Sequence, residues 1–170
     1  MSNVQLDVDL LDADIFASEF KEGFTRLPAA KRFTAEQLEV IYGMAYAHAQ
    51  QKQWQKALGI FAFLSQYGPT RRHYLAGLAL CLQKLQRYDE AINIYSLMLV
   101  LFGDNLEPSL YIAECELAQG DTVAALATLR QLDRALDDGD ALKKRAQVLA
   151  SHVAHGRGAD ADADADAVSQ

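Results

Sequence analysis

The residues of this chain that could carry chemistry are few and scattered. The sequence holds four histidines: His48, His73, His152 and His155. None of them stands beside a nucleophile, a glycine-rich loop or a metal-ligand spacing, and two histidines three residues apart are weak evidence for a metal site. Glu114 and Glu116 are two residues apart, so on a helix they point in different directions and cannot act jointly as acid and base. We therefore predict that the chain is not an enzyme and uses no metal or cofactor.

Composition narrows the class of protein. Apolar residues make up 51 % of the 170 residues, which suits one domain with a packed core. The net charge is −7 and no basic stripe is present, which argues against direct contact with nucleic acid or an anionic membrane. No apolar run approaches the roughly 20 residues of a membrane span, and the first residues lack the pattern of a signal peptide. These features predict a cytoplasmic protein.

Small residues recur at a fixed interval and indicate how the helices must be arranged. Two series of alanines are spaced by 34 residues: Ala45, Ala79 and Ala113, and Ala57, Ala91 and Ala125. That period is typical of the tetratricopeptide repeat, a pair of helices whose small residues lie where the helices cross. With the second alanine numbered 20, position 24 holds Phe61, Tyr95 and Leu129, which should fill the gap between the helices. Position 10 holds Cys81 and Cys115, which we interpret as buried packing thiols.

The repeats depart from the usual pattern at the turn inside each helix pair. The usual glycine is present only as Gly120, whereas Lys52 and Gln86 stand at this position in the first two repeats. Thr34 with Gln37 forms a capping-box pattern at the start of the first repeat. The predicted repeat helices span about 35–50, 54–66, 70–84, 88–101, 107–118 and 121–136.

Segments on either side complete the predicted fold. Between residues 10 and 24, apolar side chains recur at helical spacing: Leu11, Ile15, Phe16 and Phe20. We interpret residues 1–33 as an N-terminal helical arm that buries this face in a homodimer. A closing helix is expected at about 140–154, and residues 156–170, which alternate Ala and Asp, are expected to be a disordered acidic tail. The predicted fold is therefore all-α, with three tetratricopeptide repeats and the closing helix in residues 34–155 forming a short superhelical solenoid.

The concave face of such a solenoid is the predicted binding site. Positions 2, 5, 9, 12 and 13 of the first helix line this face. The predicted groove residues are those at positions 5, 9 and 12 of the three repeats and His73 at position 2 of the second: Tyr42, Tyr46, Ala49, His73, Ala76, Leu80, Gln83, Leu110, Glu114 and Leu117. A groove that clamps a carboxylate needs Lys, Arg or Asn, because a desolvated anion must be paired. This groove is mainly apolar and aromatic, so it should hold an extended segment with spaced hydrophobic anchors. Leu110 and Leu117 fit equally well as core residues under the closing helix.

Three stretches of sequence resemble the class II chaperones of bacterial type III secretion systems. They read LEVIYGMAYAHAQQKQWQKALGIF, YLAGLALCLQKLQRYDEAINIY and YIAECELAQGD, and the resemblance covers roughly residues 10–150. It implies a non-enzymatic cytoplasmic chaperone for hydrophobic translocator proteins, which holds a short extended segment near the translocator's N-terminus in its groove. The family's N-terminal arm commonly mediates a homodimer. Tyr42 matches a groove tyrosine of the family, whereas Ala49 stands where close members often have another.

Two other functions are compatible with this sequence. The chain could be a repeat scaffold, or a chaperone for another secreted component such as a needle subunit, which would place an amphipathic helix in the groove. It could also regulate a transcription activator when it is free of cargo.

Overall fold

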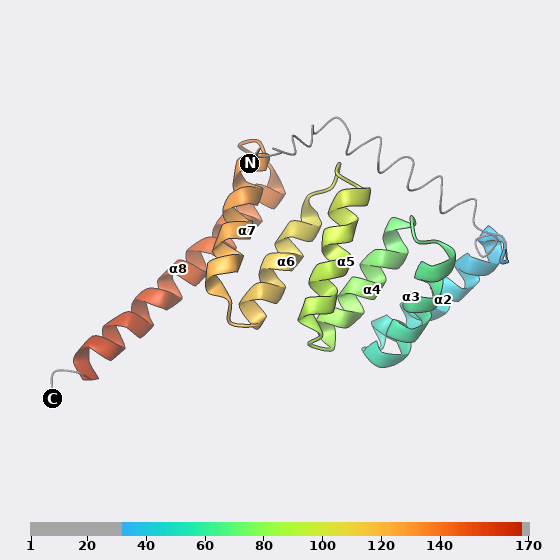
Figure 1. Ribbon diagram of the computed structural model, residues 1–170, viewed down its shortest axis with the longest axis horizontal. Helices are drawn as coiled ribbons and strands as arrows, with labels where there is room; N and C mark the ends of the chain where they lie inside the picture. Colours follow the sequence, from blue (N-terminus) through green and yellow to red (C-terminus); the bar gives the residue numbers. More distant parts are fainter. Residues whose placement is uncertain (1–31, 168–170) are drawn as a thin grey trace, which may run out of the picture. The chain divides into compact units, whose positions relative to one another are not determined.

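The computed structural model describes the backbone of residues 32–167 and the side chains through His155. Within that range every regular element is a helix (Figure 1). The helices are α2 Ala35–Gln50, α3 Trp54–Tyr67, α4 Arg72–Lys84, α5 Tyr88–Leu101, α6 Glu107–Ala118, α7 Thr122–Ala135 and α8 Ala141–Ala167. The six predicted repeat helices are confirmed to within two residues at each end. The apolar residues of the predicted arm, Leu11, Ile15, Phe16 and Phe20, lie outside the described residues.

Local interactions explain where the helices begin and turn. Thr34 caps α2, because its hydroxyl accepts from the Gln37 amide at 3.2 Å while the Gln37 side chain accepts from the Thr34 amide at 2.9 Å. The turn inside each repeat places the same position in the left-handed region, with φ of 57° at Lys52, 61° at Gln86 and 84° at Gly120. The backbone thus keeps one turn geometry in all three repeats, although only the third has the residue that suits it.

The small and bulky positions of the repeat occupy the predicted places. All six alanines of the two series have no exposed surface. At position 24, Phe61 and Tyr95 are 3 % exposed and Leu129 is 1 % exposed. Each bulky side chain fills the space that the small residues leave, which is the packing that allows the two helices of a repeat to approach closely.

Contacts divide the chain into two compact units at Asn105 and Leu106. In the first unit α2, α3, α4 and α5 pack in chain order, and α2 also contacts α4 (Figure 1). In the second unit α6 packs on α7 and α7 on α8. We predicted one domain over residues 34–155, whereas the boundary between units falls between the second and third repeats. Repeat arrays permit this division because each repeat is stabilised mainly by its immediate neighbours.

The closing helix is longer than predicted. We placed its end near residue 154, but α8 continues to Ala167, into the segment for which we expected no regular structure. That expectation rested on the aspartates at every second position, which cannot share one helix face favourably and bury no apolar surface. Alternating alanines, which have the highest helix propensity of any residue, favour the opposite outcome. The side chains that pack α8 onto its unit are Leu142, Ala146, Leu149 and Ala150. Across the part of the chain that is described, no helix is long and apolar enough to cross a membrane.

Candidate functional site

The first unit carries a hollow of about 440 Å³ between α2, the start of α3 and α4, which we call the α2–α4 hollow. Its lining consists of Tyr42, Tyr46, Ala49, Gln50, Lys52, Trp54, Phe61, His73, Ala76, Gly77 and Leu80. Six residues predicted for the binding groove are thus brought together: Tyr42, Tyr46, Ala49, His73, Ala76 and Leu80. Their role in binding stays a prediction, but their common surface is a property of the structure.

Helical spacing explains why these side chains share one surface. Tyr42, Tyr46 and Ala49 are four and three residues apart, so they lie on one face of α2. Ala76 and Leu80 repeat this spacing on α4. The surface of α4 is recessed at Ala76 and Gly77, because alanine has only a methyl group and glycine has no side chain. The hollow results from large residues at its edges and small ones between them.

Aromatic rings hold one side of the hollow in place. The ring of Tyr42 lies 6.2 Å from that of Tyr46 in a stacked arrangement and 4.8 Å from His73 in an edge-on arrangement. It also meets the buried Phe61 at 6.0 Å and Tyr74 at 5.8 Å. Ring pairs at these separations are attractive beyond the area that they bury. Tyr42 is therefore held as part of the wall, whereas Tyr46, which is 51 % exposed, is open to a ligand.

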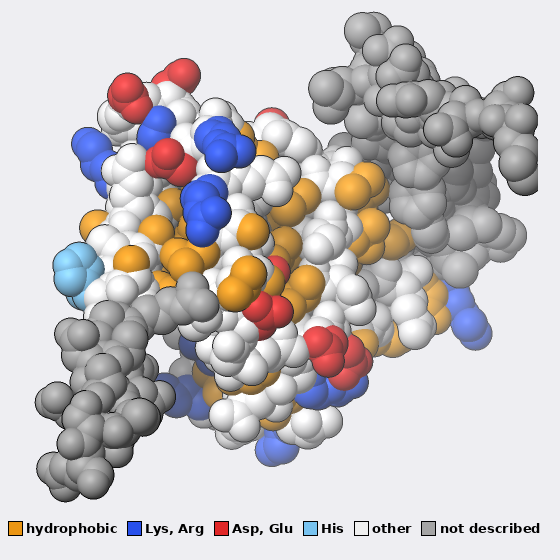
Figure 2. Space-filling model, turned by 60° about the vertical axis from the view of Figure 1, so that its left-hand side comes forward, with side chains coloured by type: hydrophobic (Ala, Val, Ile, Leu, Met, Phe, Trp, Pro, Cys, Tyr) orange, Lys and Arg blue, Asp and Glu red, His pale blue; other side chains and the backbone are white. Residues whose placement is uncertain are grey.

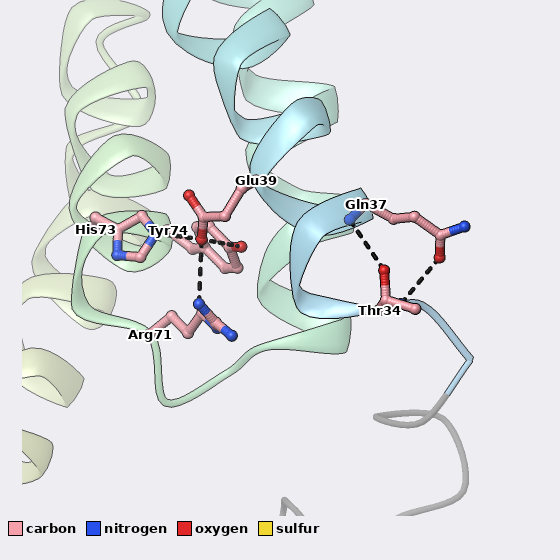
Figure 3. A network of polar contacts seen from close by, with 6 residues as sticks. All are labelled: Thr34, Gln37, Glu39, Arg71, His73 and Tyr74. Carbon is pink, nitrogen blue, oxygen red and sulfur yellow. Dashed lines mark hydrogen bonds and ion pairs between the residues drawn. The ribbon is translucent and has the colours of Figure 1, made fainter.

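A polar network joins α2 to the start of α4 beside the hollow (Figure 3). One Glu39 oxygen accepts from Arg71 at 3.1 Å and from the Tyr74 hydroxyl at 3.2 Å, and His73 Nε2 lies 3.4 Å from the same oxygen. Burial raises the pKa of Tyr74, and the negative charge of Glu39 raises it further. Burial likewise raises the pKa of Tyr42. Both phenols therefore stay protonated at neutral pH, and Tyr74 remains a hydrogen-bond donor.

The α2–α4 hollow is suited to binding apolar side chains. Leu80 is 38 % exposed and belongs, with Tyr46, to the large apolar residues that the described surface leaves open. The only ionisable side chains among its lining residues, apart from the two tyrosines, are Lys52 and His73. Among the residues that the structure describes, no three His, Cys, Asp or Glu side chains are grouped as a metal site would require. This surface offers contact area and shape, which are the properties that recognise hydrophobic anchors.

The second unit has a separate hollow of about 410 Å³ between α6 and α8, the α6–α8 hollow. It is lined by Leu110, Glu114, Lys144, Arg145, Val148, Leu149 and His152. Leu110 is only 2 % exposed and belongs to the core that α8 covers, so it forms a floor and not a free surface. Arg145 pairs with Glu107 at 2.9 Å, and that hydrogen bond lowers the pKa of the carboxyl. Figure 2 shows hydrophobic side chains reaching the surface beside Lys, Arg and His side chains.

Two predicted groove residues line neither hollow. Leu117 packs against the core of the second unit, which agrees with the alternative that it is a core residue. Gln83 accepts a hydrogen bond from the Tyr95 hydroxyl at 2.9 Å and so supports α5.

Sequence reasoning missed several lining residues of the α2–α4 hollow, among them Lys52, Trp54 and Gly77. Gln50 stands at position 13 of the repeat, a concave position that could have been included. The others come from a turn, from the second helix and from a glycine, for which the repeat numbering of the first helix carries no signal.

Comparison with known proteins places this architecture in a family. Two tetratricopeptide repeat models match the chain, one over residues 38–70 and one over residues 82–148. The chain is a tetratricopeptide-repeat protein. The matched segments contain all six repeat helices in whole or in part, so the family assignment agrees with the packing of the buried alanines.

Solved structures similar to this tetratricopeptide-repeat protein include chaperones of type III secretion. PcrH of Pseudomonas aeruginosa, in complex with the chaperone binding region of PopD, is 26 % identical with a TM-score of 0.64, covering 74 % of this chain and 97 % of that chain. PcrH in complex with the chaperone binding region of PopB is 28 % identical with a TM-score of 0.60, covering 69 % and 97 %. The translocator chaperone SycD of Yersinia enterocolitica shares the fold, at 23 % identity and a TM-score of 0.63 over 70 % and 91 % of the two chains.

A protein similar in sequence matches a comparable share of this chain. Low calcium response locus protein H of Yersinia pestis is 25 % identical over 123 residues, which is 71 % of this chain and 72 % of that protein.

Proposed function

We propose that this protein is a chaperone of a type III secretion system that binds hydrophobic translocator proteins and keeps them competent for secretion. The observation that carries the proposal is the α2–α4 hollow, an open surface of apolar and aromatic side chains in a protein similar to PcrH. PcrH has been crystallised with the chaperone binding regions of PopD and PopB. By analogy, a short segment near the N-terminus of a translocator is the ligand that we assign to this hollow.

The geometry favours an extended ligand over a helix. The hollow is bounded by side chains on two neighbouring helices, so a chain that crosses it can place successive anchors between Tyr46 and Leu80. Each apolar anchor that is buried in the hollow contributes about 1–2 kcal/mol. A few such contacts give an affinity that protects the cargo and still allows its release.

The physical demands on such a cargo agree with this mode of binding. A protein that must later enter a membrane exposes apolar segments beforehand, and these promote aggregation or insertion at the wrong place. The chaperone would act in the bacterial cytoplasm, by binding alone and without catalysis or a cofactor. Residues 1–33 would join two copies through Leu11, Ile15, Phe16 and Phe20.

Co-expression with candidate secreted proteins tests the function, followed by identification of what remains bound. The site is tested by replacing Leu80 with Asp, which places a charge where an apolar anchor should lie. We expect at least a tenfold loss of affinity for the N-terminal segment of the bound translocator, measured by titration calorimetry.

The matched control is Val100→Asp, because Val100 is also apolar and exposed, at 54 %, but lies on α5 outside the hollow. It should bind as the wild type does, and both variants should keep their helical circular dichroism. Equal affinity of the Leu80→Asp variant and the wild type would place the binding surface elsewhere.

A further inference from the structure

A short segment upstream of the described residues has the pattern of a ligand for the α2–α4 hollow. In residues 4–9, apolar Val4, Leu6 and Val8 alternate with Gln5, Asp7 and Asp9. In an extended chain, alternate side chains point to opposite sides, so the three apolar residues share one side and the acids the other. Spaced apolar anchors on an extended chain are the features that the hollow is suited to bind.

The hollow complements this segment in polarity and charge. Tyr46 and Leu80 are 51 % and 38 % exposed, so covering them with apolar side chains would remove apolar surface from water, which is favourable. Lys52 and His73 belong to the lining, whereas no acidic residue does. A segment that carries Asp7 and Asp9 beside its apolar side chains therefore meets no acidic lining residue, and the nearby Glu39 is already paired with Arg71.

The hollow is lined in part by α2, which is the first helix of the described residues. Tyr42 and Tyr46 are on α2, the helix that begins at Ala35. Residues 10–31 form the link to this unit; with residues 10–24 helical, as predicted, and the other seven extended, this link can span about 45 Å. From Ala35 to Tyr46 the helix rises only about 17 Å. The link is therefore long enough, and a tether of this length gives an effective concentration of the order of a millimolar.

We propose that residues 4–9 occupy the α2–α4 hollow of their own chain when no cargo is bound, as a tethered competitor of the cargo segment. Competition with cargo rests on the proposed function, whereas occupancy of the hollow by residues 4–9 does not. Covering Tyr46 and Leu80 would keep the empty chaperone from associating through this surface. A cargo segment with better anchors displaces the tethered one, and its apparent affinity is reduced by the fraction of hollows that are closed.

The single tryptophan of the chain provides a direct readout, because Trp54 lines the hollow. In the full-length protein, the double variant Leu6→Asp/Val8→Asp should release the segment. We expect Trp54 emission to shift to longer wavelength and acrylamide quenching to increase relative to the wild type. Gln5→Asp is the matched control, since it adds a charge on the polar side of the segment and should leave Trp54 unchanged. Equal Trp54 signals in the wild type and the double variant would overturn the proposal.

Titration with a synthetic peptide of residues 2–10 provides a second and independent test. The peptide should bind the double variant at least tenfold more tightly than the wild type, whose hollow is already occupied. Adding Leu80→Asp to the double variant should abolish that gain, which locates the site. Equal affinity for the wild type and the double variant would refute occupancy by the tethered segment.

Dilution distinguishes the same chain from a second copy. Occupancy by the same chain predicts that the Trp54 difference between wild type and double variant persists on dilution, whereas its loss would show that another copy supplies the segment and would overturn the proposal as stated. None of these three experiments uses a translocator. A negative result would therefore refute occupancy by residues 4–9 without refuting cargo binding, which is tested separately by titration calorimetry of the Leu80→Asp variant.

Discussion

At Gly77 the backbone of α4 comes too close to the ring of Phe61 for any side chain to fit. A methyl group there would lie 2.3 Å from Phe61 Cε1, so the Phe61 ring, which is only 3 % exposed, would have to shift from its packed position. We expect Gly77→Ala to lower the free energy of unfolding by about 1–3 kcal/mol, measured by urea denaturation.

Gly59 provides the control for Gly77, because it also lies in a helix and a methyl group there would meet no atom within 4 Å. Gly59→Ala should raise the free energy of unfolding by about 0.5–1 kcal/mol, through the better helix propensity of alanine. Gly77→Ala with wild-type stability would show that α3 and α4 are not packed as described.

The two cysteines predict how stability depends on alkaline pH. Cys81 and Cys115 have no exposed surface, and burial raises the pKa of each thiol from its ordinary value of 9.0 to about 11. Between these values an unfolded thiol loses its proton while the folded one keeps it, so the unfolded state is favoured as the pH rises. We expect the free energy of unfolding to be unaffected by these thiols below pH 9 and to fall from about pH 9 to about pH 11.

Denaturation of the wild type and of a Cys81→Ala/Cys115→Ala variant across this range measures the effect. The variant should show a shallower decline. The remaining slope would come from groups such as Tyr111, whose pKa is also raised by burial. Equal slopes in both proteins would mean that the thiols are more accessible than their position in the core indicates.

At the scale of the helix pair, the turn inside each repeat is a point of strain. Gln86 has a φ of 61°, a conformation in which a side chain costs about 1 kcal/mol and glycine does not. Gln86→Gly should raise the free energy of unfolding by about 0.5–1 kcal/mol, measured by thermal or urea denaturation.

A glycine placed one residue away from such a turn tests the explanation. Gln119 precedes Gly120 and has a φ of −82°, where glycine relieves no strain and adds freedom to the unfolded chain. Gln119→Gly should therefore be destabilising. If Gln86→Gly also lowered the free energy of unfolding, the proposed strain at Gln86 would be refuted.

At the scale of the whole molecule, the two ends of the chain should contribute differently to assembly. Deletion of residues 1–30 should convert a homodimer into a monomer in light scattering, because it removes the apolar face of Leu11, Ile15, Phe16 and Phe20. Truncation after His155 is the matched control, since the α8 residues that pack on the second unit end at Ala150. It should leave both the mass and the melting temperature nearly unchanged. An unchanged mass after the N-terminal deletion would contradict the dimer arrangement.

The sequence by itself determined the repeat, its helices and most of one binding surface. The alanines recur at 34 residues because every helix pair must cross at a small residue, and that requirement is local to each pair. Repeat numbering also identifies the exposed face of each first helix, which is why Tyr46 and Leu80 could be assigned to one surface before their contacts were known.

Only the tertiary structure decided which of these surfaces is open. Leu110 has the same repeat position as Tyr42 and Ala76, but it is buried in the core of the second unit, to which α8 contributes Ala146, and the chain divides into two units just before α6. The contact between Gly77 and Phe61 and the inclusion of Trp54 in the hollow depend likewise on how neighbouring helices meet. Burial is set by packing between segments that are distant in sequence. A periodic pattern shows which positions of a helix pack against a neighbour, but it does not show which segment that neighbour is.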